Sequence, residues 1–151
     1  MKTPAYRPRK FIPRPKDYGA IYRVMSRVQP FVPDELAQLN VPVMAAWERM
    51  RTGCAADHDF DTLASAVNIC MVRGEEIDPL CVETAQRAQD ALMRTMDRHK
   101  ATGRWGFDGP ALQDIPLAMD LYRQMLELST PMQMQSALRA TVQRMNKGQT
   151  L

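Results

Sequence analysis

The side chains that could support catalysis or bind a metal are concentrated in one short stretch, DHDFD, at positions 57–61. It offers carboxylates and an imidazole, which are ligands for zinc and other divalent metals. The residues concerned are Asp57, His58, Asp59 and Asp61. Consecutive residues at the start of a helix point in different directions, and the helix dipole favours acidic residues there. We therefore interpret the stretch as a helix start capped by Asp57 or Asp59, and we predict no metal site.

The other reactive residue types are isolated from suitable partners. His99 has only Asp97 nearby in the sequence, and on a helix that carboxylate points elsewhere. Cys54, Cys70 and Cys81 form no CxxC pair, and no serine lies in a GxSxG motif. The glycine patterns that bind nucleotide phosphates are also missing. We therefore expect no catalytic residues, no cofactor and no enzymatic activity.

The N-terminus differs from the rest of the chain in charge and in proline content. Residues 1–27 carry eight basic side chains and one acidic side chain, a net charge of +7, whereas the remaining 124 residues carry 12 basic and 16 acidic ones, a net charge of −4. Six of the 11 prolines lie in residues 1–33. This composition predicts an extended arm with polyproline-II character over residues 1–32. Within it, the helical spacing of Ile21, Val24, Met25 and Val28 predicts a short helix over Tyr18–Val28.

Cationic and aromatic side chains alternate along this arm. Cations neutralise phosphates and aromatic rings stack on bases, so the composition is typical of a nucleic-acid contact. The candidate binding residues are Tyr6, Arg7, Arg9, Lys10, Phe11, Arg14, Lys16 and Tyr18. Three interpretations stay open: contact with nucleic acid, docking to an acidic protein, and a tail that aids solubility or wraps around its own acidic body.

From Pro33 onwards, apolar residues recur with the 3.6-residue period of α-helices, and strand patterns are nearly absent. Start and stop residues divide the pattern into helices that begin near 33, 57, 79, 110 and 131 and end near Gly53, Gly74, Gly103, Ser129 and Gly148. Asp78 is expected to cap the third helix, and Thr130 with Gln133 to form a capping box at the start of the fifth. The apolar stripe of the second helix consists of Phe60, Leu63, Ala64, Val67, Cys70 and Met71, and that of the fourth of Ile115, Ala118, Met119, Tyr122, Met125 and Leu126. We expect Pro42 to break or restart the first helix, with Met44, Trp47 and Met50 or Arg51 on its apolar face. The sequence thus predicts an all-α protein, an antiparallel bundle of four to five helices over residues 33–148 with a tail at 149–151.

The chain contains 12 methionines, and many of them lie in its C-terminal half. Most are expected to fill a helical core, but methionine also adapts to varied binding partners. If Met134, Leu138 and Met145 are exposed on the last helix, they form a partner face or the seam of a homodimer.

The sequence also predicts a cytoplasmic location. No apolar run approaches the roughly 20 residues needed to span a membrane. The basic N-terminus is not followed by the apolar segment of a secretory signal. An odd number of cysteines fits a reducing compartment.

Three segments carry a resemblance: the start KTPAYRPRK, the helical FDTLASAVN, and the later ATGRWGFDGPALQDIPLAMDLYRQMLELST. Together they resemble the short uncharacterised helical proteins carried by prophages and plasmids of Gram-negative bacteria. The resemblance implies an accessory role without site residues, such as regulating phage genes or blocking a host defence complex by occupying a protein surface.

The function predicted from the sequence is that of a non-enzymatic helical binding protein that acts by recognising a protein surface, such as that of a host defence complex. The alternative is a nucleic-acid-binding regulator, or a small helical subunit of a ribonucleoprotein complex, that uses the basic arm.

Overall fold

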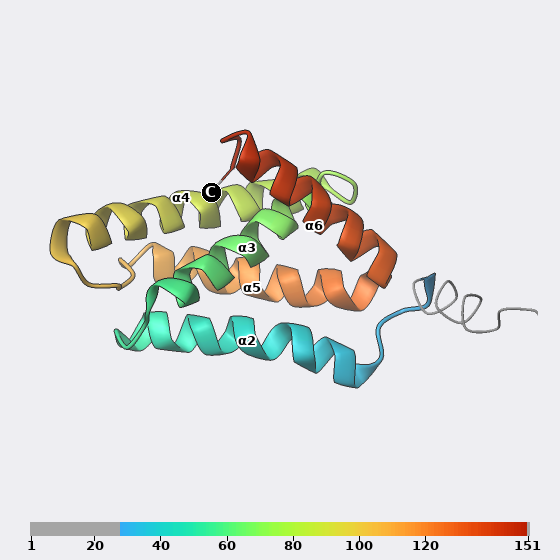
Figure 1. Cartoon of the computed structure of the whole chain (residues 1–151), viewed down its shortest axis with the longest axis horizontal. Helices are drawn as coiled ribbons and strands as arrows, with labels where there is room; N and C mark the ends of the chain where they lie inside the picture. The colour runs from blue at the N-terminus through green and yellow to red at the C-terminus, as the bar shows by residue number, and fades with distance from the viewer. Residues whose placement is uncertain (1–27, 151) are drawn as a thin grey trace, which may run out of the picture.

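The computed structural model describes residues 28–150, which form five α-helices and no strand. The helices are α2 (Pro33–Thr52), α3 (Asp57–Gly74), α4 (Pro79–Thr102), α5 (Ala111–Leu128) and α6 (Pro131–Asn146). Successive helices run in opposite directions, as Figure 1 shows. The predicted all-α antiparallel bundle is therefore confirmed. The predicted extended arm lies almost wholly outside the described residues, as does the predicted helix over Tyr18–Val28, of which Val28 alone is described.

Helix α3 lies at the centre of the bundle and packs against each of the other four helices (Figure 1). Twelve of its 18 residues are buried. They include the whole apolar stripe predicted for this segment, which is Phe60, Leu63, Ala64, Val67, Cys70 and Met71. Since a helix that is buried on several sides needs apolar residues around most of its circumference, the composition of this segment explains its central place.

The helix ends follow from local sequence signals. The Asp78 carboxylate accepts a hydrogen bond from the Leu80 amide at 2.7 Å, as expected of the residue that caps α4. At the start of α6, Thr130 and Gln133 form the predicted reciprocal capping box. Gly53 and Gly103 end α2 and α4 with φ angles of 76° and 70°, a conformation that glycine adopts without strain.

The prediction for Pro42 is wrong, because α2 continues through it without a break. A proline inside a helix leaves the carbonyl four residues earlier without its hydrogen bond and costs about 3 kcal/mol. Here both Pro42 and Gln38 lie in exposed positions, so water can satisfy that carbonyl. Burial of the next residues on the inner face offsets the rest of the cost. That face consists of Val43, Ala46 and Met50, whereas Met44, which the sequence placed on it, is 44% exposed.

One detail of α3 differs from the prediction. The residue at the N-cap is Ala56, and Asp59 lies three residues later, where its carboxylate accepts a hydrogen bond from the Ala56 amide at 3.0 Å. Gly74 is the last residue of α3, as predicted. A Cβ atom at Gly74 would lie 3.0 Å from the Cβ of Cys81 and 3.2 Å from the Val82 amide nitrogen, so the glycine permits the tight approach of α3 and α4.

Polar contacts fasten α6 to the bundle at its two ends. Near its C-terminal end, Arg144 forms two hydrogen bonds with the carboxylate of Glu75, each of 2.7 Å. Before its first turn, the Ser129 hydroxyl accepts a hydrogen bond from Arg73 at 3.1 Å. These contacts hold α6 beside α3. None of the helices in the described part is long and apolar enough to cross a membrane.

Candidate functional site

The acidic stretch at the start of α3 has a structural role in the described molecule. Asp59 is 1% exposed, and its Oδ1 accepts hydrogen bonds from Arg49 Nε at 2.9 Å and Arg49 Nη2 at 2.5 Å. These bonds hold the pKa of Asp59 at about 2, below its ordinary value of 3.8, although burial opposes the shift. Asp59 therefore connects α2 to α3. Within residues 28–150, no three histidine, cysteine or acidic side chains are arranged to hold a metal ion.

His99 belongs to a stack of aromatic rings. It lies against Trp105 with ring centroids 3.7 Å apart, and Phe60 stacks on Trp105 at 4.8 Å. Because two near-parallel rings cannot share one face, both faces of the indole are covered. The Trp105 Nε1 donates to Asp57 Oδ1 at 2.9 Å, so this carboxylate holds the loop after α4. The cluster leaves no indole face on which a nucleobase could stack.

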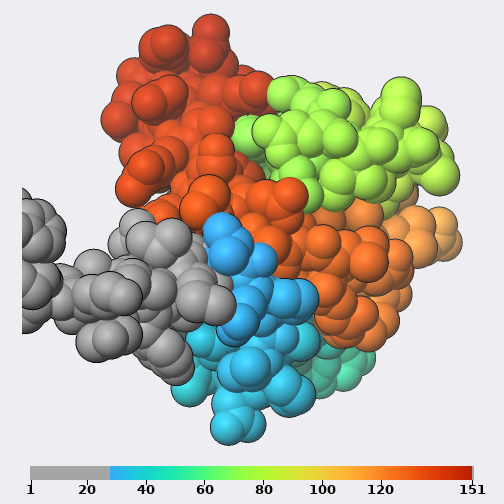
Figure 2. All heavy atoms as spheres, turned by 90° about the vertical axis from the view of Figure 1, so that its right-hand side faces the viewer, coloured from blue at the N-terminus to red at the C-terminus, as the bar shows by residue number. Residues whose placement is uncertain are grey.

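An apolar hollow of about 380 Å³ lies between α2 and α6. Figure 2 shows that the start of α2, the end of α5 and α6 come together at this end of the molecule. We call the hollow the α2–α6 groove. Its lining residues are Phe31, Leu39, Ile69, Tyr122, Leu126, Pro131, Met134, Gln135 and Leu138.

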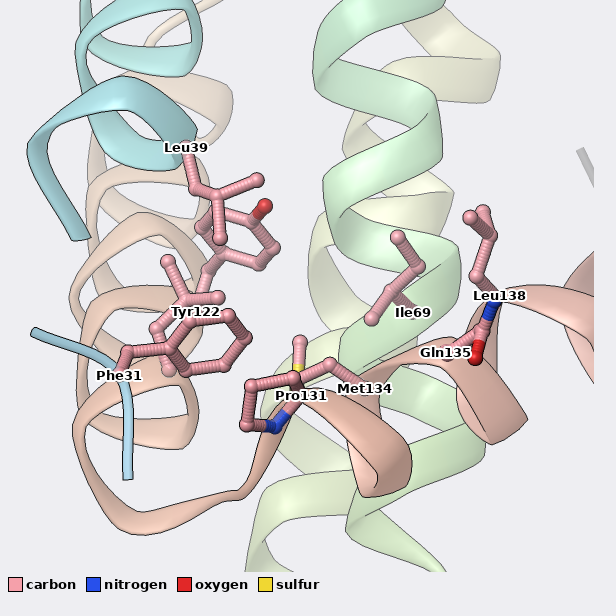
Figure 3. A pocket seen from close by; sticks show the side chains of 9 residues that line it. Phe31, Leu39, Ile69, Tyr122, Pro131, Met134, Gln135 and Leu138 are labelled. Carbon is pink, nitrogen blue, oxygen red and sulfur yellow. The ribbon is translucent and has the colours of Figure 1, made fainter. Parts of the chain in front are cut away.

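The groove has a buried floor and exposed rims. Tyr122, Leu126 and Met134 are 6%, 1% and 8% exposed, whereas Leu39 and Leu138, on opposite sides, are 39% and 46% exposed. In Figure 3 the side chains from α2 and α5 face those from α3 and α6 across the hollow. Burial raises the pKa of the Tyr122 phenol. The groove therefore presents apolar side chains to water on both sides of a packed floor.

A second hollow of about 500 Å³ extends the groove along α2 and α3. It shares Leu39, Ile69 and Tyr122 with the first. Its further lining is more polar and includes His58 and Asp61 at the start of α3. The two hollows together make an elongated depression with an apolar end at Phe31 and a polar end at Asp61.

The structure brings together part of the predicted partner face. Leu138 lines the α2–α6 groove, and Met145 lies on the same exposed side of α6 at 43% exposure. The condition that all three residues are exposed is not met, because Met134 is 8% exposed and forms part of the groove floor. Met134, Leu138 and Met145 lie on one side of α6, so their different exposure follows from their positions along the helix and not from separate faces.

The candidate binding residues of the arm lie outside the described residues, so their predicted role stays a prediction. These are Tyr6, Arg7, Arg9, Lys10, Phe11, Arg14, Lys16 and Tyr18.

Sequence reasoning did not find the opposite wall of the groove, formed by Phe31 and Leu39. The available signal was that the apolar stripe of α2 begins one turn before the part that the helix buries. Leu39 lies four residues before Val43, on the same helical face as Ala46 and Met50, yet it is 39% exposed. An apolar stripe that continues beyond its buried part indicates a further contact surface.

No protein-family model matches the chain, and no curated protein or solved structure matches it significantly.

Proposed function

We propose that the protein is a non-enzymatic binding protein that receives an apolar segment of a partner protein in the α2–α6 groove. The observation that carries the proposal is the pairing of a buried apolar floor with exposed Leu39 and Leu138 on facing rims. Grooves of this kind bind amphipathic helices, whose apolar side chains at positions i, i+3, i+4 and i+7 enter the depression.

The lining favours a peptide segment over a small ligand. Sites for small molecules combine apolar walls with several polar groups that fix the ligand's orientation. In the apolar hollow the polar side-chain groups are the Gln135 amide and the Tyr122 hydroxyl. The depression also continues past Leu39 into the second hollow. An extended apolar occupant uses this shape better than a compact one.

The charges of the described body give less support to nucleic-acid binding. Seven of the ten arginines in residues 28–150 are paired with a carboxylate: Arg49, Arg51, Arg73, Arg87, Arg94, Arg123 and Arg144. Paired arginines offer little attraction to phosphates, since the neighbouring acid cancels the charge. Nucleic-acid binding would therefore depend on the basic arm of residues 1–27.

The wider role that we propose is that of a mobile-element accessory protein, which occupies a surface of a host complex such as a defence complex. The sequence resemblance supports this role, and a protein that works by occupying a surface needs a docking groove but no reactive groups. Leu138 is the first residue to test, because it lies on the exposed rim of the groove.

The test is affinity purification of the full chain from its native host, with nuclease treatment. Leu138→Asp places a charge on the rim, and Leu117→Asp is the matched control because Leu117 is also exposed in mid-helix (53%) but lies outside the groove. We expect the wild type and Leu117→Asp to retain a stoichiometric protein partner, and Leu138→Asp to lose it while keeping the wild-type circular dichroism spectrum and melting temperature. Retention of the partner by Leu138→Asp, or a partner lost on nuclease treatment, would contradict the proposal.

A further inference from the structure

We propose that residues 18–27 of the same chain occupy the α2–α6 groove when no partner is bound. The inference rests on the proposed function in one respect, that the groove is a docking surface, and it adds a competing occupant. It is carried by the position at which this segment joins the described structure, by the direction and length of the groove, and by the charges at the ends of the groove.

The segment joins the described structure next to the wall of the groove. Phe31, two residues before α2, already forms part of the groove wall. Residue 27 is therefore only four residues from a side chain inside the groove. A short tether of this kind gives the attached segment an effective concentration on the order of millimolar at the groove. The segment thus needs only weak affinity to occupy it.

The direction and the length of the groove fit a short helix formed by the segment. Pro30 separates the segment from α2 and prevents a helix from continuing through the junction. Helices joined by a short connection lie side by side and antiparallel. The groove runs along α2 from Phe31 past Leu39 to Pro42, where the second hollow lies. Ten residues in a helix span about 15 Å. The groove has a similar length, because Phe31 and Pro42 are eleven residues apart and most of these residues are in α2.

The sequence of the segment, YGAIYRVMSR, has an amphipathic pattern. At 100° per residue, its apolar residues fall on one side and its arginines on the other. The apolar set is Tyr18, Ile21, Tyr22, Val24 and Met25. Such a face matches the groove floor of Tyr122, Leu126 and Met134, which is apolar but for one phenol hydroxyl.

The charges of the arm and of the groove are complementary. In an antiparallel arrangement the segment continues, at the far end of the groove, into Arg14 and Lys16. Asp61 lines the second hollow there, and its carboxylate has no ion-pair partner among residues 28–150. Basic residues that reach an acidic end are attracted to it. The net charges of +7 on residues 1–27 and −4 on the rest of the chain also attract the arm to the body.

The test uses the isolated full chain and methyl NMR of Ile69 and Leu138, which lie on the wall opposite Leu39. Ile21→Asp with Met25→Asp disrupts the apolar face of the segment. Ala20→Asp with Ser26→Asp changes the charge equally on the opposite face and is the matched control. We expect the first pair to shift the Ile69 and Leu138 methyl resonances, the control pair to leave them in place, and the wild type to show nuclear Overhauser effects between Met25 and these methyl groups.

Each outcome decides the inference. Methyl shifts that appear only in the variant with Ile21→Asp and Met25→Asp, and that do not depend on protein concentration, support an intramolecular occupant. Equal shifts in both pairs, or none in either, overturn it. A concentration-dependent shift also overturns it, because a second copy of the chain then fills the groove. Partner capture by Leu138→Asp is measured in a separate experiment. The proposed function and the proposed occupation by residues 18–27 can therefore fail independently.

Discussion

Replacement of Asp59 by asparagine should destabilise the bundle by an amount that depends on pH. Asparagine can still accept the hydrogen bond from the Ala56 amide, but it loses the negative charge facing Arg49. The pKa of Asp59 lies at about 2 in the folded chain, against an ordinary value of 3.8. A difference of this size corresponds to about 2.4 kcal/mol. Because the Arg49 side chain is 44% exposed and screened by solvent, we expect about 1–2 kcal/mol.

The pH dependence follows from the direction of the shift. A carboxyl group whose pKa is lower in the folded state stabilises the fold above the pKa of the unfolded state. The stabilisation by Asp59 should therefore be complete above about pH 5 and decline as the pH falls from about 4 towards 2.

The assay is urea denaturation of the wild type and Asp59→Asn at pH 7, 5, 4 and 3. Asp61→Asn, an exposed position two residues away, is the control and should change the unfolding free energy by less than about 0.5 kcal/mol. The reasoning is refuted if Asp59→Asn is as stable as the control at pH 7, or if its deficit is the same at pH 3 as at pH 7.

Two further predictions concern the thiols and the α3–α4 junction. Cys54 is exposed, whereas Cys70 is fully buried and burial raises the pKa of its thiol. A thiol reagent should therefore modify Cys54 at least about 100-fold faster than Cys70. Comparable rates of modification would contradict the packing of α3. Gly74→Ala should lower the unfolding free energy by about 1–2 kcal/mol in denaturant titrations, because the added methyl group presses on Cys81 and the backbone of α4. Gly106→Ala has open space around it and should have little effect, so equal stability of the two variants would refute the close approach.

The elements that the sequence predicted correctly are those fixed by neighbouring residues. Asp78 and Thr130 cap helices through amides within three positions, so a short window of sequence contains the whole interaction. The buried stripes of α3 and α5 were also predictable, since each lies on one continuous helical face. Pro42 could not be judged in the same way. Whether α2 survives it depends on packing of Val43 and Met50 against helices that are distant in the sequence.

The candidate site was predictable only in part, for a similar reason. Leu138 could be named from the pattern of α6 alone. The groove, however, takes its walls from Phe31 and from four helices, and Met134 is buried in it although it lies on the same face of α6 as Leu138. A surface assembled from separate segments has no local signature in the sequence.

The most direct test of the groove as a docking surface is site-specific photo-crosslinking in the native host. A photoreactive amino acid is placed at position 138 on the groove rim or, as the control, at position 117 outside it. We predict adducts from position 138 that map to one discrete partner protein or to residues 18–27 of the chain, and few from position 117. Equal yields at the two positions, or no adduct at position 138, would contradict the account.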